Sequence, residues 1–143
     1  GMAKQELSQE QQLNDNVSHL RSLTQQPPHA RPNKFAGLTR VESSSQPQVA
    51  TYKAPSLESG ANPDDHDVYI SYQAPPVSYF DNMNQQRGET LLAQAEYAIQ
   101  QLKQSDEYQR AKRVYHISGG SKIGDEVARR MATKHKEVPT QVF

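Results

Sequence analysis

The chain has no cysteine among its 143 residues. Neither a disulfide framework nor a thiolate zinc site can therefore form. This absence fits a reducing compartment, so we expect a cytoplasmic location, with a secreted effector or a virion component as alternatives. The sequence also has no apolar run near the roughly 18–20 residues that cross a bilayer, and we expect no membrane span.

The chain has few hydrophobic residues and no net charge. Hydrophobic residues make up only 34% of the chain, its mean hydropathy is −0.93, and its formal net charge is zero. Low hydrophobicity is typical of disorder, but charge repulsion does not hold this chain open. Its length suffices for one ordinary domain. These properties together predict a chain that is folded in part.

Known catalytic motifs are missing as well. The sequence holds no cysteine nucleophile, no G-x-S-x-G and no H-E-x-x-H pattern. The text DDHD at 64–67 places His66 among three carboxylates, a ligand set that suits several divalent metals. Consecutive residues cannot all point at one ion, so a polar turn before a strand is favoured. We therefore expect no enzymatic activity, no cofactor and no metal.

Residues 1–63 differ in composition from the rest of the chain. They are rich in Pro, Ser and Gln, with prolines at 27, 28, 32, 47, 55 and 63. Each proline removes a backbone donor and disfavours helix at the preceding residue. This pattern predicts a flexible, disordered N-terminal arm, extended over 25–63.

One stretch of this arm has helical periodicity. Leu13, Val17 and Leu20 recur at helical spacing and predict a short helix at 7–24. Isolated helices this short are marginal in water. The stretch is either a transient helix in a disordered tail or a helix that docks, in a partner's groove or on its own domain. In the docking case, the three residues named here are the candidate partner-binding side chains.

Residues 64–143 predict a compact β-α-β-α domain, so the fold class is α+β or small α/β. The expected elements are a strand through HDVYISY, a helix at 89–104, a strand at VYHIS and a helix at 121–136. A crossover through the first helix would make the two strands parallel neighbours. Because two strands form a weak sheet, either the segment 48–54 adds a strand or the protein associates with a partner.

The turn SGGSK, between the second strand and the second helix, is a candidate anion site. The first N–H groups of a helix lack intrahelical partners and favour negative charge. Ser118, Gly119, Gly120, Ser121 and Lys122 would supply hydroxyls, close backbone approach and a cation. The spacing matches neither the P-loop nor the dinucleotide fingerprint. The alternative is a structural turn in which the glycines reverse the chain and Ser121 caps the helix.

The neutral total charge conceals two halves of opposite sign. Residues 64–107 carry eight acids against two bases, and residues 109–136 carry eight bases against two acids. A basic segment at 110–136 that includes Arg129 and Arg130 could neutralise nucleic-acid phosphates. Alternatively, the two halves face each other within one fold or between two copies, or the basic face meets a protein partner.

These features together predict a non-enzymatic interaction protein, an adaptor or accessory factor with another protein as its partner. The alternative is phosphate-ligand or nucleic-acid binding through the basic segment and the double-glycine turn. Self-association is a further expectation, because the predicted core is small.

Overall fold

The structure is a computed structural model that describes the backbone of residues 2–24, 34–35, 37–41, 46, 48–58, 60–75 and 84–143. The described residues contain four helices and six strands. In chain order these are α1 (Met2–Thr24), β1 (Lys34–Phe35), β2 (Leu38–Arg40), β3 (Val49–Pro55), β4 (His66–Tyr72), α2 (Asn84–Leu102), α3 (Asp106–Gln109), β5 (Val114–Ser118), α4 (Lys122–Lys134) and β6 (Thr140–Val142). None of the helices in the described part of the chain is long and apolar enough to cross a membrane.

The six strands form one mixed sheet whose spatial order is the chain order, β1 to β6. The pairs from β1 to β4 are antiparallel, and β4, β5 and β6 are parallel. The predicted α+β class is confirmed, and so is the prediction that the strands around HDVYISY and VYHIS are parallel neighbours. The strands β1, β2 and β6 were not predicted, because two or three residues show no periodicity.

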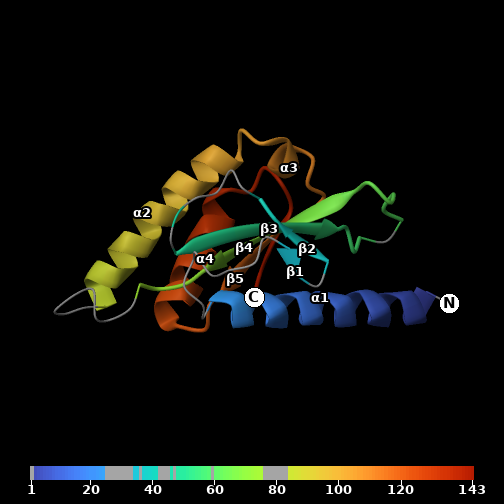
Figure 1. The fold of residues 1–143 in the computed structure, drawn as a ribbon, viewed down its shortest axis with the longest axis horizontal. Helices are drawn as coiled ribbons and strands as arrows, with labels where there is room; N and C mark the ends of the chain where they lie inside the picture. The colour runs from blue at the N-terminus through green and yellow to red at the C-terminus, as the bar shows by residue number, and fades with distance from the viewer. Residues whose placement is uncertain are drawn as a thin grey trace.

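Helices cover both faces of the sheet (Figure 1). On one face, α4 packs against β4 and β5, and α2 packs against α4 and β3, around a core that includes Ile70, Leu91 and Met131. On the other face lies α1, which packs against a second core built on Tyr69 and Tyr115. Because β4 is covered on both sides, six of its seven residues are buried, as expected for parallel strands between two layers.

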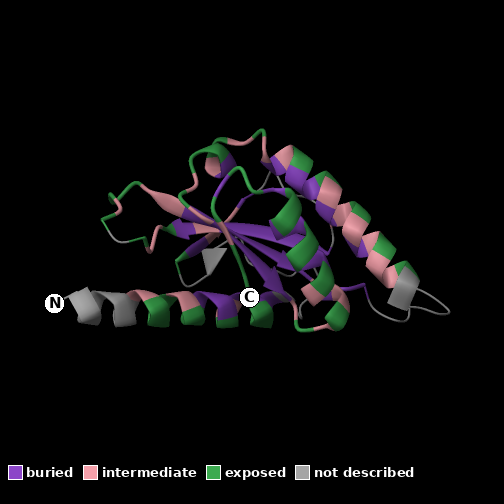
Figure 2. Cartoon of the chain, turned by 180° about the vertical axis from the view of Figure 1, so that it is seen from behind, coloured by how far each residue is buried: buried purple, intermediate pink, exposed green. Residues whose placement is uncertain are grey.

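The predicted helix at 7–24 is α1, and it packs on the chain's own sheet. Val17 and Leu20 are 5% and 0% exposed, and Leu13 is partly buried against the same core. The buried Asn16 Nδ2 donates to the Tyr69 hydroxyl at 3.1 Å. In Figure 2 the buried residues of α1 are seen in its second half, toward Thr24. In this structure the candidate partner-binding side chains of α1 therefore pack against the chain's own sheet.

The structure also differs from the expected arm at 1–63. The boundary at 63 falls in the loop between β3 and β4, which pair antiparallel at seven positions from Val49↔Tyr72 to Pro55↔His66. The segment 48–54 thus adds the missing strand, one of the two options that the weak sheet required. The composition of residues 1–63 as a whole obscured this strand, because the prolines lie around it in the sequence and not within it. Pro55 is its last residue and Pro63 lies in the following loop, whereas the prolines at 27, 28, 32 and 47 lie outside the described residues.

Candidate functional site

The double-glycine turn joins the end of β5 to the start of α4. The Gly119 N–H donates to the Tyr72 carbonyl at 2.8 Å, so the turn is tied to the end of β4. Gly120 has φ of +105°, a conformation that favours glycine. Ser121 caps α4, because its Oγ accepts from the Gly124 N–H at 2.9 Å. The backbone and the cap therefore follow the structural-turn alternative.

Gly119 is required by the close approach of β4. A Cβ at this position would lie 2.2 Å from Gln73 Oε1 and 2.9 Å from the Tyr72 carbonyl oxygen. The Gln73 side chain can rotate away, but the carbonyl belongs to the backbone of a buried strand. The position therefore accepts no side chain unless the turn shifts away from β4.

We expect Gly119→Ala to lower the free energy of unfolding by about 1–3 kcal/mol, the usual cost of overpacking. Gly88→Ala is the matched control. Gly88 lies inside α2, and a Cβ at this position would meet only Ile123 Cγ2 of α4, at 4.0 Å. The control should stabilise the protein by about 0.5–1 kcal/mol, since alanine favours helix. Urea unfolding of both variants checks the prediction, and equal stabilities would contradict it.

Few groups of the turn remain open to a ligand. Ser118 is 1% exposed, and its Oγ accepts from the Gly120 N–H and donates to the Ser121 carbonyl. Lys122 is exposed, and its backbone N–H has no hydrogen-bond partner among the described residues. Together with Arg87 it lines a hollow of about 410 Å³ at the N-terminus of α4. Of the five predicted residues, only Lys122 offers a charged side chain to this hollow.

The basic residues of 110–136 are dispersed over several elements. Lys134 Nζ donates to Glu96 Oε1 on α2 at 2.7 Å, and Lys112 lies 3.9 Å from Asp65 in the β3–β4 loop. Both pairs join the basic half to the acidic half within one fold. Exposed pairs of this kind contribute at most about 1 kcal/mol each. The ion pairs follow the prediction that the two halves face each other.

Arg129 and Arg130 behave differently although they are neighbours. Arg130 Nη2 pairs with Glu126 Oε1 at 3.0 Å, one turn away on α4. Arg129 is exposed and has no ion-pair partner among the described residues. A charge available to an external anion therefore lies at Arg129 and not at Arg130.

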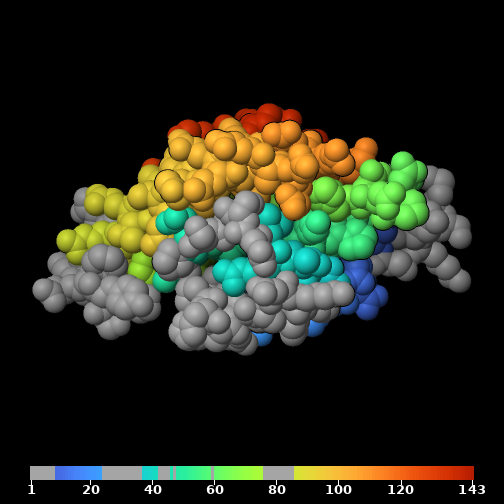
Figure 3. Space-filling view, turned by 45° about the horizontal axis from the view of Figure 1, so that its top comes forward, coloured from blue at the N-terminus to red at the C-terminus, as the bar shows by residue number. Residues whose placement is uncertain are grey.

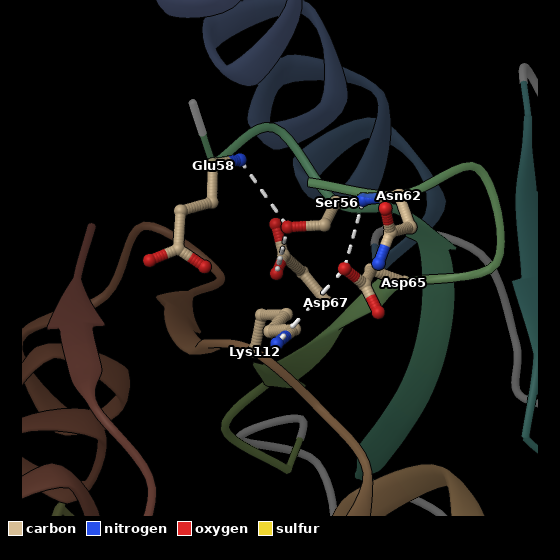
Figure 4. Close-up of polar contacts among 6 residues, drawn as sticks. All are labelled: Ser56, Glu58, Asn62, Asp65, Asp67 and Lys112. Atoms are coloured by element: carbon tan, nitrogen blue, oxygen red, sulfur yellow. Dashed lines mark hydrogen bonds and ion pairs between the residues drawn. The ribbon is translucent and has the colours of Figure 1, made fainter. Parts of the chain in front are cut away.

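The acidic segment 64–67 lies where the β3–β4 loop ends and β4 begins; Figure 4 shows its Asp65 and Asp67. Asp67 is 1% exposed, and its two carboxylate oxygens accept from Ser56 Oγ at 3.0 Å and from the Leu57 N–H at 3.1 Å. Burial raises the pKa of Asp67, and these hydrogen bonds oppose the rise. Among the residues that the structure describes, no three Asp, Glu, His or Cys side chains gather closely enough to hold a metal ion. Asp64 lies in a turn, and His66 and Asp67 begin β4.

A buried histidine and a buried tyrosine share a hydrogen bond between the sheet and its helices. His116 Nδ1 lies 2.7 Å from the Tyr72 hydroxyl, and both residues are at most 1% exposed. Burial, followed by the charge of His135, lowers the pKa of His116 to about 4. The pair therefore belongs to the buried core of the described residues.

Three hollows lie side by side between α2 and α4. Their volumes are about 320, 410 and 520 Å³, and residues of 87–96 and 121–134 line them. Glu126 lines all three, and we call this surface the α2–α4 groove. Figure 3 shows α2 as a long ridge with C-terminal residues beside it.

The groove has an apolar floor and a charged rim. Leu92 of α2 and Ile123 of α4 are half-buried on the floor, above the buried Val127 and Met131. The rim carries five basic side chains and three acidic ones. The ion pairs described above engage two of the acids, Glu96 and Glu126. Positive charge is therefore in excess at the surface of the groove.

Sequence reasoning found the basic residues of the groove but not the groove itself. Leu92 lies in the helix predicted at 89–104, next to the fully buried Leu91, and is itself half-buried. The available signal was the two adjacent leucines, because an apolar face that is wider than its partner leaves one row of side chains at the surface. The opposing row from Ile123 lies 31 positions later, and only the packing of the two helices brings the rows together.

No family model matches the chain, and neither a curated protein nor a solved structure is significantly similar to it.

Proposed function

We propose that the chain is a non-enzymatic protein-binding module, an adaptor or accessory domain, and that the α2–α4 groove receives its partner. The observation that supports this proposal is the combination of half-buried Leu92 and Ile123 on the floor with Lys122 and Arg129 on the rim. These two cations have no ion-pair partner among the described residues. Protein interfaces combine an apolar centre with a polar edge in this way. The lining of the groove also extends along α4 from Ser121 to Lys134.

A site-specific crosslinker tests this function in the native cell. Thr133 is exposed and lines the groove, whereas Gln100 is exposed on α2 outside it. A photoreactive side chain at 133 should crosslink a discrete protein that the same side chain at 100 does not. Adding Arg129→Glu should reduce that crosslink, because it reverses an unpaired charge on the rim. Identical products from the two positions would contradict the proposal.

Phosphate-ligand or nucleic-acid binding at the double-glycine turn stays a prediction. It is supported by Arg87 and Lys122 around the hollow at the N-terminus of α4. The burial of Ser118 and the ion pairs of the basic segment reduce the groups that could take part. Titration with inorganic phosphate and with a short duplex at low salt tests it. A response at Lys122 would favour this second function.

A further inference from the structure

We propose that the α2–α4 groove takes an acidic amphipathic helix, with carboxylates two turns apart on either side of an apolar stripe. This inference rests on the proposed function and specifies the partner of the same surface. It follows from the length of the groove, the walls that form it, the spacing of its apolar floor and the position of its unpaired charges.

The length of the groove fits a helical segment. Its lining extends along α4 from the cap at Ser121 to Lys134. At 1.5 Å per residue, this stretch of helix is about 20 Å long. A small ligand fills a compact pocket, whereas a groove of this length accommodates about 14 residues of a second helix lying alongside.

The walls of the groove favour a helix over an extended strand. Both walls are α-helices, whose backbone groups are hydrogen-bonded within the helix except at the ends. An extended peptide needs an open sheet edge to satisfy its own backbone, and the groove offers none. A helical partner satisfies its backbone internally and presents only side chains.

The floor has the spacing that a partner helix meets. Ile123, Val127 and Met131 follow one another every four residues on α4, and Leu92 opposes them from α2. Amphipathic helices dock with apolar anchors at intervals of three and four residues. The half-buried Leu92 and Ile123 are the side chains that such anchors would cover.

The charges of the rim specify an acidic partner. Lys122 and Arg129 have no ion-pair partner among the described residues. They lie seven residues apart on α4, which places them on the same face at a separation of about 10 Å. Carboxylates two turns apart on a partner helix would meet both. The acids Glu89, Glu96 and Glu126 on the same rim disfavour the continuous phosphates of a nucleic acid.

Designed peptides test the inference with the full-length chain. The probe is a labelled amphipathic peptide of about 14 residues with leucine anchors and glutamates two turns apart. A charge-reversed peptide with lysines in place of the glutamates and a short DNA duplex are its competitors. At low salt the acidic peptide should bind about tenfold more tightly than the reversed peptide, and salt should weaken its binding. Its NMR shift changes should centre on Leu92, Ile123 and Arg129.

Charge reversal on the protein makes the test specific. The double variant Lys122→Glu, Arg129→Glu should bind the acidic peptide about tenfold more weakly than the wild-type protein does, and it should bind the reversed peptide more tightly than the acidic one. Arg110→Glu, Lys136→Glu is the matched control, since both residues are exposed outside the groove and change the net charge equally. The control should retain the preference of the wild-type protein.

Three results would overturn the inference: similar binding of both peptides, equal losses in the two double variants, or no binding of the acidic peptide at about 1 mM, a free energy near −4 kcal/mol. Tighter binding of the duplex would replace it with the nucleic-acid function. If the peptides fail but the crosslink at 133 still depends on Arg129, the protein-binding function stands without a helical acidic partner. If neither responds, both proposals fall.

Discussion

Leu20→Ala should lower the free energy of unfolding by about 2–5 kcal/mol, the range for a fully buried leucine. Leu20 has no exposed surface and belongs to the core between α1 and the sheet, beside Tyr69 and Tyr115. Truncation removes apolar contact and leaves a cavity under a helix that is held by few other large side chains. The measurement is urea unfolding, followed by circular dichroism and by tyrosine fluorescence.

Ser18→Ala provides the control for Leu20→Ala, because Ser18 lies two residues away on the exposed side of the same helix. It should leave stability unchanged or raise it slightly, since alanine favours helix. A flexible arm would give small changes for both variants. Equal, negligible effects would therefore contradict the packing of α1 as a layer of the fold.

The protein should lose about 3 kcal/mol of stability between pH 6.5 and pH 4 through His116. In the folded protein, burial holds the pKa of this imidazole at about 4, below its ordinary value of 6.5. The unfolded chain therefore binds more protons in this interval, and stability decreases as the pH falls. Above pH 6.5 both states are neutral at this residue, and the full contribution is present.

His116→Asn should flatten this part of the pH profile. The asparagine cannot titrate, and its amide can replace Nδ1 as the partner of the Tyr72 hydroxyl. Urea midpoints at intervals from pH 4 to pH 7.5 measure the change. Burial also lowers the pKa of His135, so His135→Asn separates its share of the slope. An unchanged wild-type slope in His116→Asn would contradict the assignment.

The elements with strong periodicity were predictable from sequence, and those defined by tertiary contact were not. The runs HDVYISY, VYHIS and ETLLAQAEYAIQQL became β4, β5 and most of α2. In contrast, β6 has three residues and is held by its pairing with β5. The sequence left open whether the helix at 7–24 is transient or docks on another surface, because a thin apolar stripe does not reveal the surface that covers it.

The candidate site was predictable only in its charges. Arg129 and Lys122 were identified from the basic segment, but sequence could not show that Glu126 engages Arg130 and leaves Arg129 unpaired. The role of Gly119 was similarly hidden, because its close contact is with Tyr72, 47 positions earlier. Contacts over such separations depend on the register of the sheet, which cannot be read from a single sequence.

The chain-order sheet has a consequence for folding. Each strand pairs with the one that precedes it, so the sheet can grow from one edge without any later strand inserting between earlier ones. The helix α1 packs on strands that follow it at a long distance in the chain: Asn16 donates to the Tyr69 hydroxyl, and the Arg21 Nε donates to the Ser118 carbonyl, 97 residues away. Because α1 packs on both β4 and β5, its apolar side is fully covered only after β5 has joined the sheet.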